Sequence, residues 1–223
     1  YEDVWFHAAD GTRLHAWFCP RDSPRAVVLF AHGNAGNLAD RGWLMKSLQR
    51  DLHVSSLIFD YRGYGRSEGS PSVEGAVQDA RAARTVLAGK AGVPETEIVL
   101  YGRSLGAAVA VQLGAELAPR GLILESTFSS LRDVAAHHYP YLAWVVPRDK
   151  LDSASRIVKY HGPLLQSHGD ADATIPYSLG KKFFEAANEP KEFVTIHGAD
   201  HNDPQSSEYY ERLDAFIDDF VRR

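Results

Sequence analysis

The sequence contains one cysteine, Cys19, so the chain can form no internal disulfide and carries no signature of a redox compartment. It has no run of about 18 apolar residues, the length that a membrane-spanning helix requires. No signal peptide opens the chain, which begins at Tyr1 rather than at methionine. The sequence therefore leaves the location open. It fits a soluble cytoplasmic domain, and equally one whose N-terminal leader or anchor has been removed.

The sequence also lacks an excess of basic charge. It has 24 Lys and Arg residues against 29 Asp and Glu, which gives a net charge of −5 over 223 residues. Because phosphate binding draws on clustered Lys and Arg, this balance argues against nucleic acid or an anionic membrane surface as the main partner. The composition is 44% hydrophobic and 24% charged, which excludes disordered, collagen-like and disulfide-scaffold classes.

Short β-branched or aromatic runs alternate with longer segments of helical period, the pattern of a mainly parallel sheet covered by helices. No linker-like shift in composition divides the chain, so we expect a single α/β domain over residues 1–223. The predicted strands are Val4–Ala8, Leu14–Phe18, Ala26–Ala31, Val54–Asp60, Glu97–Tyr101, Leu122–Ser126, Leu164–His168 and Phe193–Ile196. The predicted helices are Leu38–Arg50, Ser72–Leu87, Leu105–Leu117, Tyr177–Ala187 and Ser206–Val221.

The least regular stretch, Ser129–Pro163, is longer than an ordinary connection between two strands. It contains the apolar run Tyr139–Pro147, which is too short to span a bilayer. Because long insertions beside a sheet edge often cover a site, we expect a small lid that lines an apolar pocket. A short segment packed on the body is the alternative, and both can hold. The candidate lid and pocket residues are Tyr139, Tyr141, Leu142, Trp144 and Val145.

A candidate nucleophile lies in Gly102-Arg103-Ser104-Leu105-Gly106, which matches the pattern G-x-S-x-G. The match alone is weak, but it follows a predicted strand and precedes an Ala-rich predicted helix, as the motif requires. Glycines leave room where strand and helix backbones approach each other, and the helix dipole favours developing negative charge. We therefore predict Ser104 as a nucleophile. A tight turn with a serine N-cap is the alternative.

A serine hydroxyl needs a base, and the base needs an orienting group. His201 lies in a polar loop after the last predicted strand, and α/β sheets assemble their sites in such loops. We favour it over His197, which lies at the strand end. Spacing alone leaves three candidates for the acid: Asp170, Asp172 and Glu125. The two histidines lie four apart in a turn rather than on a helix, so we predict no metal site, and no cofactor is implied.

An oxyanion needs backbone N–H donors. The glycines of the segment Ala31–Asn37 let its N–H groups turn inward. We predict the N–H groups of Asn34 and Leu105 as the two donors, with Ala35 as the alternative to Asn34. His32 is interpreted as a structural residue that forms hydrogen bonds within this loop.

Taken together, these motifs resemble the α/β-hydrolase family, in particular small serine hydrolases with a minimal cap, a group that includes the protein depalmitoylases. The resemblance rests on HGNAGN at 32–37, FDYRGYGRS at 59–67, YGRSLG at 101–106, SHGDAD at 167–172 and the Asp200-His201 pair, in the family's order. It implies an α/β-hydrolase fold of about eight strands with a short cap at 129–163. It also aligns the acid with Asp172.

The predicted function is a serine hydrolase that cleaves carboxylic esters or thioesters through an acyl-enzyme on Ser104, His201 and Asp172. The substrate is a small molecule or an acyl group, and the resemblance adds acylated proteins as one class. A peptidase or amidase on the same residues and a non-catalytic ligand-binding module are the alternatives. We expect a preference for short to medium acyl chains, because a cap of this size cannot enclose a long one.

Overall fold

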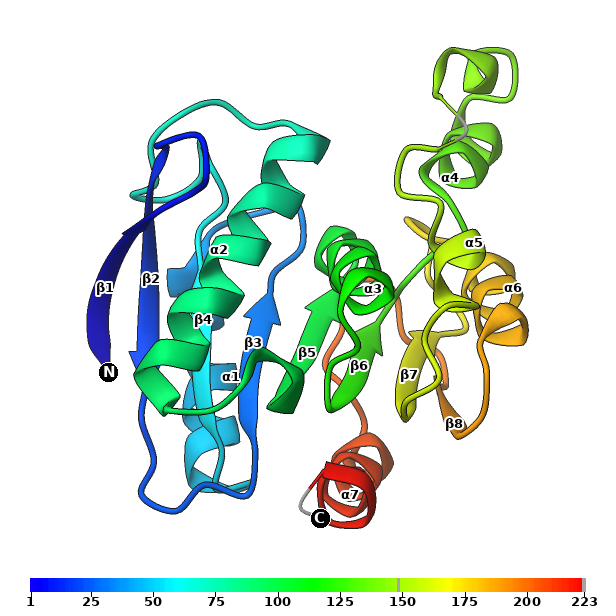
Figure 1. Ribbon diagram of the computed structural model, residues 1–223. Helices are drawn as coiled ribbons and strands as arrows, with labels where there is room; N and C mark the ends of the chain where they lie inside the picture. Colours follow the sequence, from blue (N-terminus) through cyan, green and yellow to red (C-terminus); the bar gives the residue numbers. More distant parts are fainter. Residues whose placement is uncertain (148, 222–223) are drawn as a thin grey trace.

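Within residues 1–147 and 149–221, which the computed structural model describes, eight strands form one sheet in the order β1-β2-β4-β3-β5-β6-β7-β8 (Figure 1). β1 pairs antiparallel with β2, β2 pairs antiparallel with β4, and the other neighbours are parallel. The predicted mainly parallel sheet of about eight strands is therefore confirmed. The strands are β1 (Glu2–His7), β2 (Arg13–Cys19), β3 (Val27–Ala31), β4 (Ser55–Phe59), β5 (Ile98–Arg103), β6 (Gly121–Glu125), β7 (Leu164–Gly169) and β8 (Lys191–Ile196).

Helices cover both faces of the sheet, as the alternating pattern predicts. Apolar residues of α2, α3 and α6 pack on one face, and those of α1 and α7 pack on the other (Figure 1). No helix in the described part of the chain has both the length and the apolar character needed to cross a bilayer. The helices are α1 (Gly42–Arg50), α2 (Val73–Ala91), α3 (Leu105–Glu116), α4 (Leu131–His138), α5 (Ser153–Ile157), α6 (Tyr177–Ala186) and α7 (Ser207–Phe216), with short turns η1 (Leu38–Arg41), η2 (Glu95–Glu97), η3 (Ala143–Val145) and η4 (Ile217–Val221).

The insertion at residues 129–163 is more regular than its sequence indicates, because it contains α4, η3 and α5. Polar N-caps start both α-helices: the side chain of Ser130 accepts the N–H of Asp133, and the side chain of Asp152 accepts the N–H of Ser155. In Figure 1, α4 and the turn that follows it rise above the sheet at the upper right. This part of the insertion therefore stands at the edge where the central parallel strands end, whereas α5 packs beside α3 and α6.

Close backbone contact between α3 and the sheet positions the turn at Ser104. A methyl group at Gly106 would overlap the carbonyl oxygen of Ala31, at the end of β3, and one at Gly102 would overlap the carbonyl of Gly106. Only glycine allows α3 to lie this close to β3 and β5. The two glycines of the motif are therefore required by packing.

Gly106→Ala should lower the free energy of unfolding, because overpacking of this kind costs about 1–3 kcal/mol. Gly89→Ala is the matched control: Gly89 is an exposed residue of α2, and nothing lies within 4 Å of an added Cβ there. Alanine at that position should stabilise the protein by about 0.5–1 kcal/mol, since it is the better helix former. Urea unfolding of both variants tests the pair, and equal shifts in the same direction would contradict the packing argument.

Candidate active site

Ser104 lies in a strained turn between β5 and α3. Its backbone has φ +54° and ψ −117°, a conformation that residues other than glycine rarely adopt. The N–H of Ser104 donates to the carbonyl of Glu125 at 2.9 Å, which ties the turn to the end of β6. The partly exposed hydroxyl is thereby presented at the carboxyl edge of the sheet.

The structure brings Ser104 together with two of the other predicted residues. His201 Nε2 lies 3.1 Å from Ser104 Oγ, and His201 Nδ1 lies 2.8 Å from Asp172 Oδ2. Because an ionised carboxylate can only accept, Nδ1 carries the proton in that pair, which leaves Nε2 as an acceptor for the hydroxyl. The arrangement can therefore take a proton from Ser104.

The contacts of the Asp172 side chain favour its ionised form. Its Oδ1 accepts the N–H groups of Thr174 at 2.9 Å and Ile175 at 2.7 Å. Burial opposes ionisation, but contacts with His168 and His201 and the N–H of Ile175 together outweigh it and hold the pKa of Asp172 well below its usual range. The Nε2 atom of His168 lies 3.4 Å from Oδ2 and also contacts the Ile175 carbonyl at 2.8 Å.

The other two candidate acids have different partners. Asp170 binds the exposed ring of His197, with Oδ2 and Nδ1 2.9 Å apart. Glu125 is buried and accepts the hydroxyl of Tyr101. Among the described residues, neither carboxylate forms a hydrogen bond with His201, and no cluster of three or more His, Cys, Asp or Glu side chains could hold a metal ion.

Two polar side chains, whose contacts were not predicted from the sequence, hold the His201 loop. Arg103, the residue before the candidate nucleophile, donates from Nη2 to the carbonyl oxygen of His201 at 2.7 Å. Asp200 Oδ1 accepts the N–H groups of His201 at 2.7 Å and Ala173 at 2.9 Å. Arg103 occupies a variable position of the G-x-S-x-G pattern, so the motif carried no signal for its role.

Asn34 and Leu105 line the same cavity as Ser104. Leu105 is the first residue of α3, where backbone N–H groups have no partner within the helix. Within residues 1–147 and 149–221, no group accepts the N–H of Asn34 or of Leu105. Both N–H groups are thus available to an oxyanion, and their role as its donors stays a prediction.

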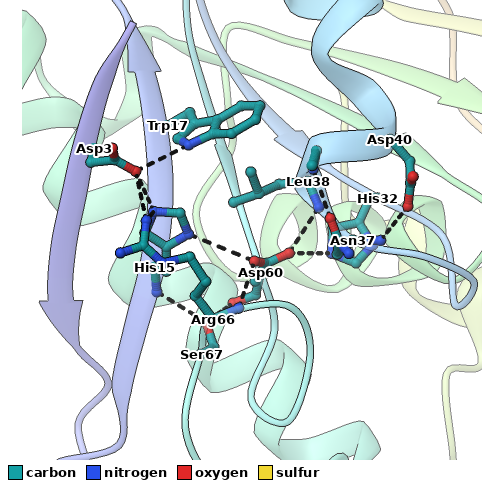
Figure 2. A network of polar contacts seen from close by, with 11 residues as sticks. Asp3, His15, Trp17, His32, Asn37, Leu38, Asp40, Asp60, Arg66 and Ser67 are labelled. Carbon is teal, nitrogen blue, oxygen red and sulfur yellow. Dashed lines mark hydrogen bonds and ion pairs between the residues drawn. The ribbon is translucent and has the colours of Figure 1, made fainter.

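A polar network around the buried Asp60 contacts the loop of residues 32–37 (Figure 2). Asp60 accepts the N–H of Leu38 through Oδ1 at 2.8 Å and that of Arg66 through Oδ2 at 3.2 Å. The rings of His32 and His15 flank this carboxylate at 3.8 and 3.7 Å. Burial lowers the pKa of His32, and its Nδ1 contacts the Gly33 carbonyl at 2.7 Å, which fits the structural role predicted for this histidine.

The cavity beside Ser104 has a volume of about 360 Å³. Its wall differs from the prediction, since the five candidate pocket residues at positions 139–145 do not line it and are 60–90% exposed. The physical reason is that α4 ends at His138 and the chain then rises away from the sheet (Figure 1). Their role as a lid stays a prediction. The apolar wall includes Val73, Ala76, Leu105, Phe128, Leu131, Val134, Leu151 and Ile175.

Comparison with known proteins gives matches along most of the chain. The family model described as serine aminopeptidase, S33, matches residues 22–154. An uncharacterized protein of Mycobacterium tuberculosis is 41% identical over 216 residues, which cover 96% of this chain and 76% of that protein. The α/β hydrolase domain-containing protein 17B of Xenopus laevis is 32% identical over 211 residues, covering 93% and 72%. An esterase of Pyrococcus furiosus superposes with a TM-score of 0.81 at 20% identity, covering 99% of this chain and 93% of the other.

Asp172→Asn should lower the free energy of unfolding at neutral pH, because the charge-assisted contacts of the carboxylate are lost. The fold holds the pKa of Asp172 below its unfolded value of about 3.9, so the carboxylate's stabilisation is fully present above that pH. It is lost as the pH falls through the folded pKa. The gap between wild type and variant should therefore narrow as the pH falls below about 4.

Urea unfolding at stepped pH measures this gap. Asp170→Asn is the matched control two residues earlier, where an exposed ion pair with His197 should contribute much less. A gap for Asp172→Asn that does not narrow below about pH 4 would contradict the assignment.

Proposed function

The chain belongs to the α/β-hydrolase family, and we propose that it is a serine hydrolase that cleaves carboxylic esters or thioesters. The observation that carries the proposal is the hydrogen-bonded series from Ser104 Oγ to His201 and on to Asp172, with distances of 3.1 and 2.8 Å. The strained backbone of Ser104 and the low pKa of the Asp172 carboxyl support it, since a serine nucleophile needs both presentation and an oriented base.

In the proposed reaction, Ser104 Oγ attacks the acyl carbonyl while His201 Nε2 takes its proton. Asp172 keeps the imidazole oriented and stabilises it once it is protonated. His201 then gives the proton to the departing alcohol or thiol, which leaves the acyl group on Ser104. Water repeats the sequence on this ester and releases the carboxylic acid and the free enzyme.

Charge that develops on the carbonyl oxygen would be stabilised by the backbone N–H groups of Asn34 and Leu105. Both residues border the cavity together with Ser104, and neither N–H is engaged by another group in the described residues. The positive end of α3 points toward the same place. Such fixed donors are usually the largest electrostatic contribution to acyl transfer, and losing one costs about 3–4 kcal/mol of barrier.

The apolar wall of the cavity supports an acyl group as the part of the substrate that binds there. Esters and thioesters of small molecules and acylated proteins share this feature, so both fit the proposal. Hydrolysis of peptides or amides is the second candidate, because the matching family model carries an aminopeptidase's description. A p-nitrophenyl ester and a p-nitroanilide with the same acyl group distinguish the two activities.

Ser104→Ala should abolish labelling by a fluorophosphonate probe and lower kcat on p-nitrophenyl butyrate by at least about a thousandfold. Ser207→Ala, which removes an exposed hydroxyl on α7, is the control and should keep full activity. Wild-type turnover by the Ser104→Ala variant would show that another residue is the nucleophile. A wild-type protein that resists labelling and hydrolyses none of the substrates would instead indicate a binding module.

Among p-nitrophenyl esters from C4 to C16, kcat/KM should be highest for short to medium chains. The cavity lies near the lower end of the roughly 300–1,000 Å³ typical of ligand pockets, so it cannot enclose a long chain. Val134→Phe should shift the preference to still shorter chains by filling part of the wall. A higher kcat/KM for C16 than for C4 would overturn the prediction, and an altered chain-length profile in Trp144→Ala would support the lid role of the exposed turn.

A further inference from the structure

The loop of residues 61–67 contacts the 32–37 loop through two tyrosine hydroxyls. Tyr61 donates to the carbonyl oxygen of His32 at 3.1 Å, and Tyr64 donates to Asn34 Oδ1 at 2.6 Å. Tyr61, Tyr64 and Asn34 all border the cavity that contains Ser104. The second hydrogen bond thus ends on the residue whose N–H is a proposed oxyanion donor.

Asn34 needs such a contact because little else holds it. Asn34 is exposed. Within residues 1–147 and 149–221, its side chain forms one hydrogen bond, the one that Tyr64 donates. Its backbone N–H has no acceptor there. A donor stabilises an oxyanion only if it is held in place beforehand, to within about 0.5 Å. A single tether from a fixed group can supply that restraint.

Tyr64 is itself held by a rigid loop. The loop of residues 61–67 is closed by hydrogen bonds from the N–H of Tyr64 to the carbonyl of Tyr61 and from the N–H of Ser67 to the carbonyl of Tyr64, each 2.9 Å. The Ser67 hydroxyl donates to the backbone carbonyl of Asp60 at 2.7 Å. A methyl group at Gly65, which has φ +49°, would overlap the Asp60 carboxylate, so the backbone lies directly against this buried anchor.

The same carboxylate fixes the far end of the 32–37 loop. Asp60 is 1% exposed, and it accepts the N–H of Arg66 on one side and the N–H of Leu38 on the other (Figure 2). Both loops are therefore hydrogen-bonded to the same buried carboxylate, that of Asp60. The Tyr64–Asn34 hydrogen bond joins the same two loops a second time, on the side that faces the cavity.

From this geometry we propose that Tyr64 is a positioning residue, which acts through the side chain of Asn34 to hold the Asn34 N–H in place for the oxyanion. The inference rests on the proposed function and names a residue that the reaction scheme does not contain. Because the oxyanion forms only as the reaction proceeds, loss of the tyrosine hydroxyl should reduce kcat and leave KM nearly unchanged.

A double-mutant cycle tests this proposal. Tyr64→Phe removes the hydroxyl and keeps the ring on the cavity wall, while Asn34→Ala removes the acceptor and keeps the backbone N–H. Each single variant should lower kcat on p-nitrophenyl butyrate about tenfold, with KM within about twofold of wild type. The double variant should be no slower than either single one, because both changes break the same bond.

Tyr160→Phe is the matched control. Like Tyr64→Phe, it removes a tyrosine hydroxyl that donates a hydrogen bond. The acceptor here is the backbone carbonyl of Pro163, at 3.1 Å, at the opposite end of the sheet, before β7 begins. This variant should lose some thermal stability and keep the wild-type kcat. The melting temperatures of all four variants separate a loss of fold from a loss of positioning.

An unchanged kcat in Tyr64→Phe, or a raised KM at constant kcat, would overturn the proposal. So would independent effects that multiply in the double variant, since the hydroxyl would then act on the substrate itself. These outcomes leave the proposed function standing if wild-type protein hydrolyses the ester and is labelled at Ser104. A wild-type protein that does neither overturns the proposed function, and the inference with it.

Discussion

The close approach of α3 to the ends of β3 and β5 is the constraint from which the rest of the site follows. Glycine at 102 and 106 lets the helix backbone meet the strand backbone where any side chain would overlap it. The chain can then pass from strand to helix only through a sharp turn, and Ser104 takes a strained conformation with φ +54° and ψ −117°. The buried contacts of the sheet and α3 offset this local strain. As a result, the Ser104 hydroxyl is partly exposed at the edge where the central parallel strands end.

Polar contacts, in addition to apolar packing, hold the loops around that hydroxyl. Arg103 binds the carbonyl of His201, so the turn that presents the serine also restrains the histidine. Asp200 joins the histidine loop to the segment that contains Asp172, and the buried Asp60 holds the loops on the other side of the cavity. Loops are mobile when few contacts hold them. Short hydrogen bonds from rigid elements can give them the precision that acyl transfer requires.

Sequence patterns predicted the fold well because apolar runs report burial directly: the strand predicted at Ala26–Ala31 lies at Val27–Ala31, with all five residues buried. The spacing of the residues did not distinguish Asp170 from Asp172 as the acid. The two follow the same strand and differ only in the direction that the turn gives their side chains. The resemblance pointed to Asp172, and in the structure it is Asp172 that contacts His201. The pocket wall and the Tyr64–Asn34 bond escaped prediction because they depend on how separate loops meet in space, which no local pattern records.

In the proposed reaction, Ser104 carries the acyl group during turnover and His201 activates its hydroxyl. Peptide mapping by mass spectrometry, after acid quenching of the protein in the first turnovers with p-nitrophenyl acetate, tests this most directly. We expect an acetyl group on the peptide that contains Ser104, and we expect it to be lost when the unquenched protein is chased without substrate. The same peptide should stay unmodified over that time in His201→Ala. Turnover without any acetylated peptide, or with an acetyl group that forms and is lost on another residue, would contradict this role of Ser104.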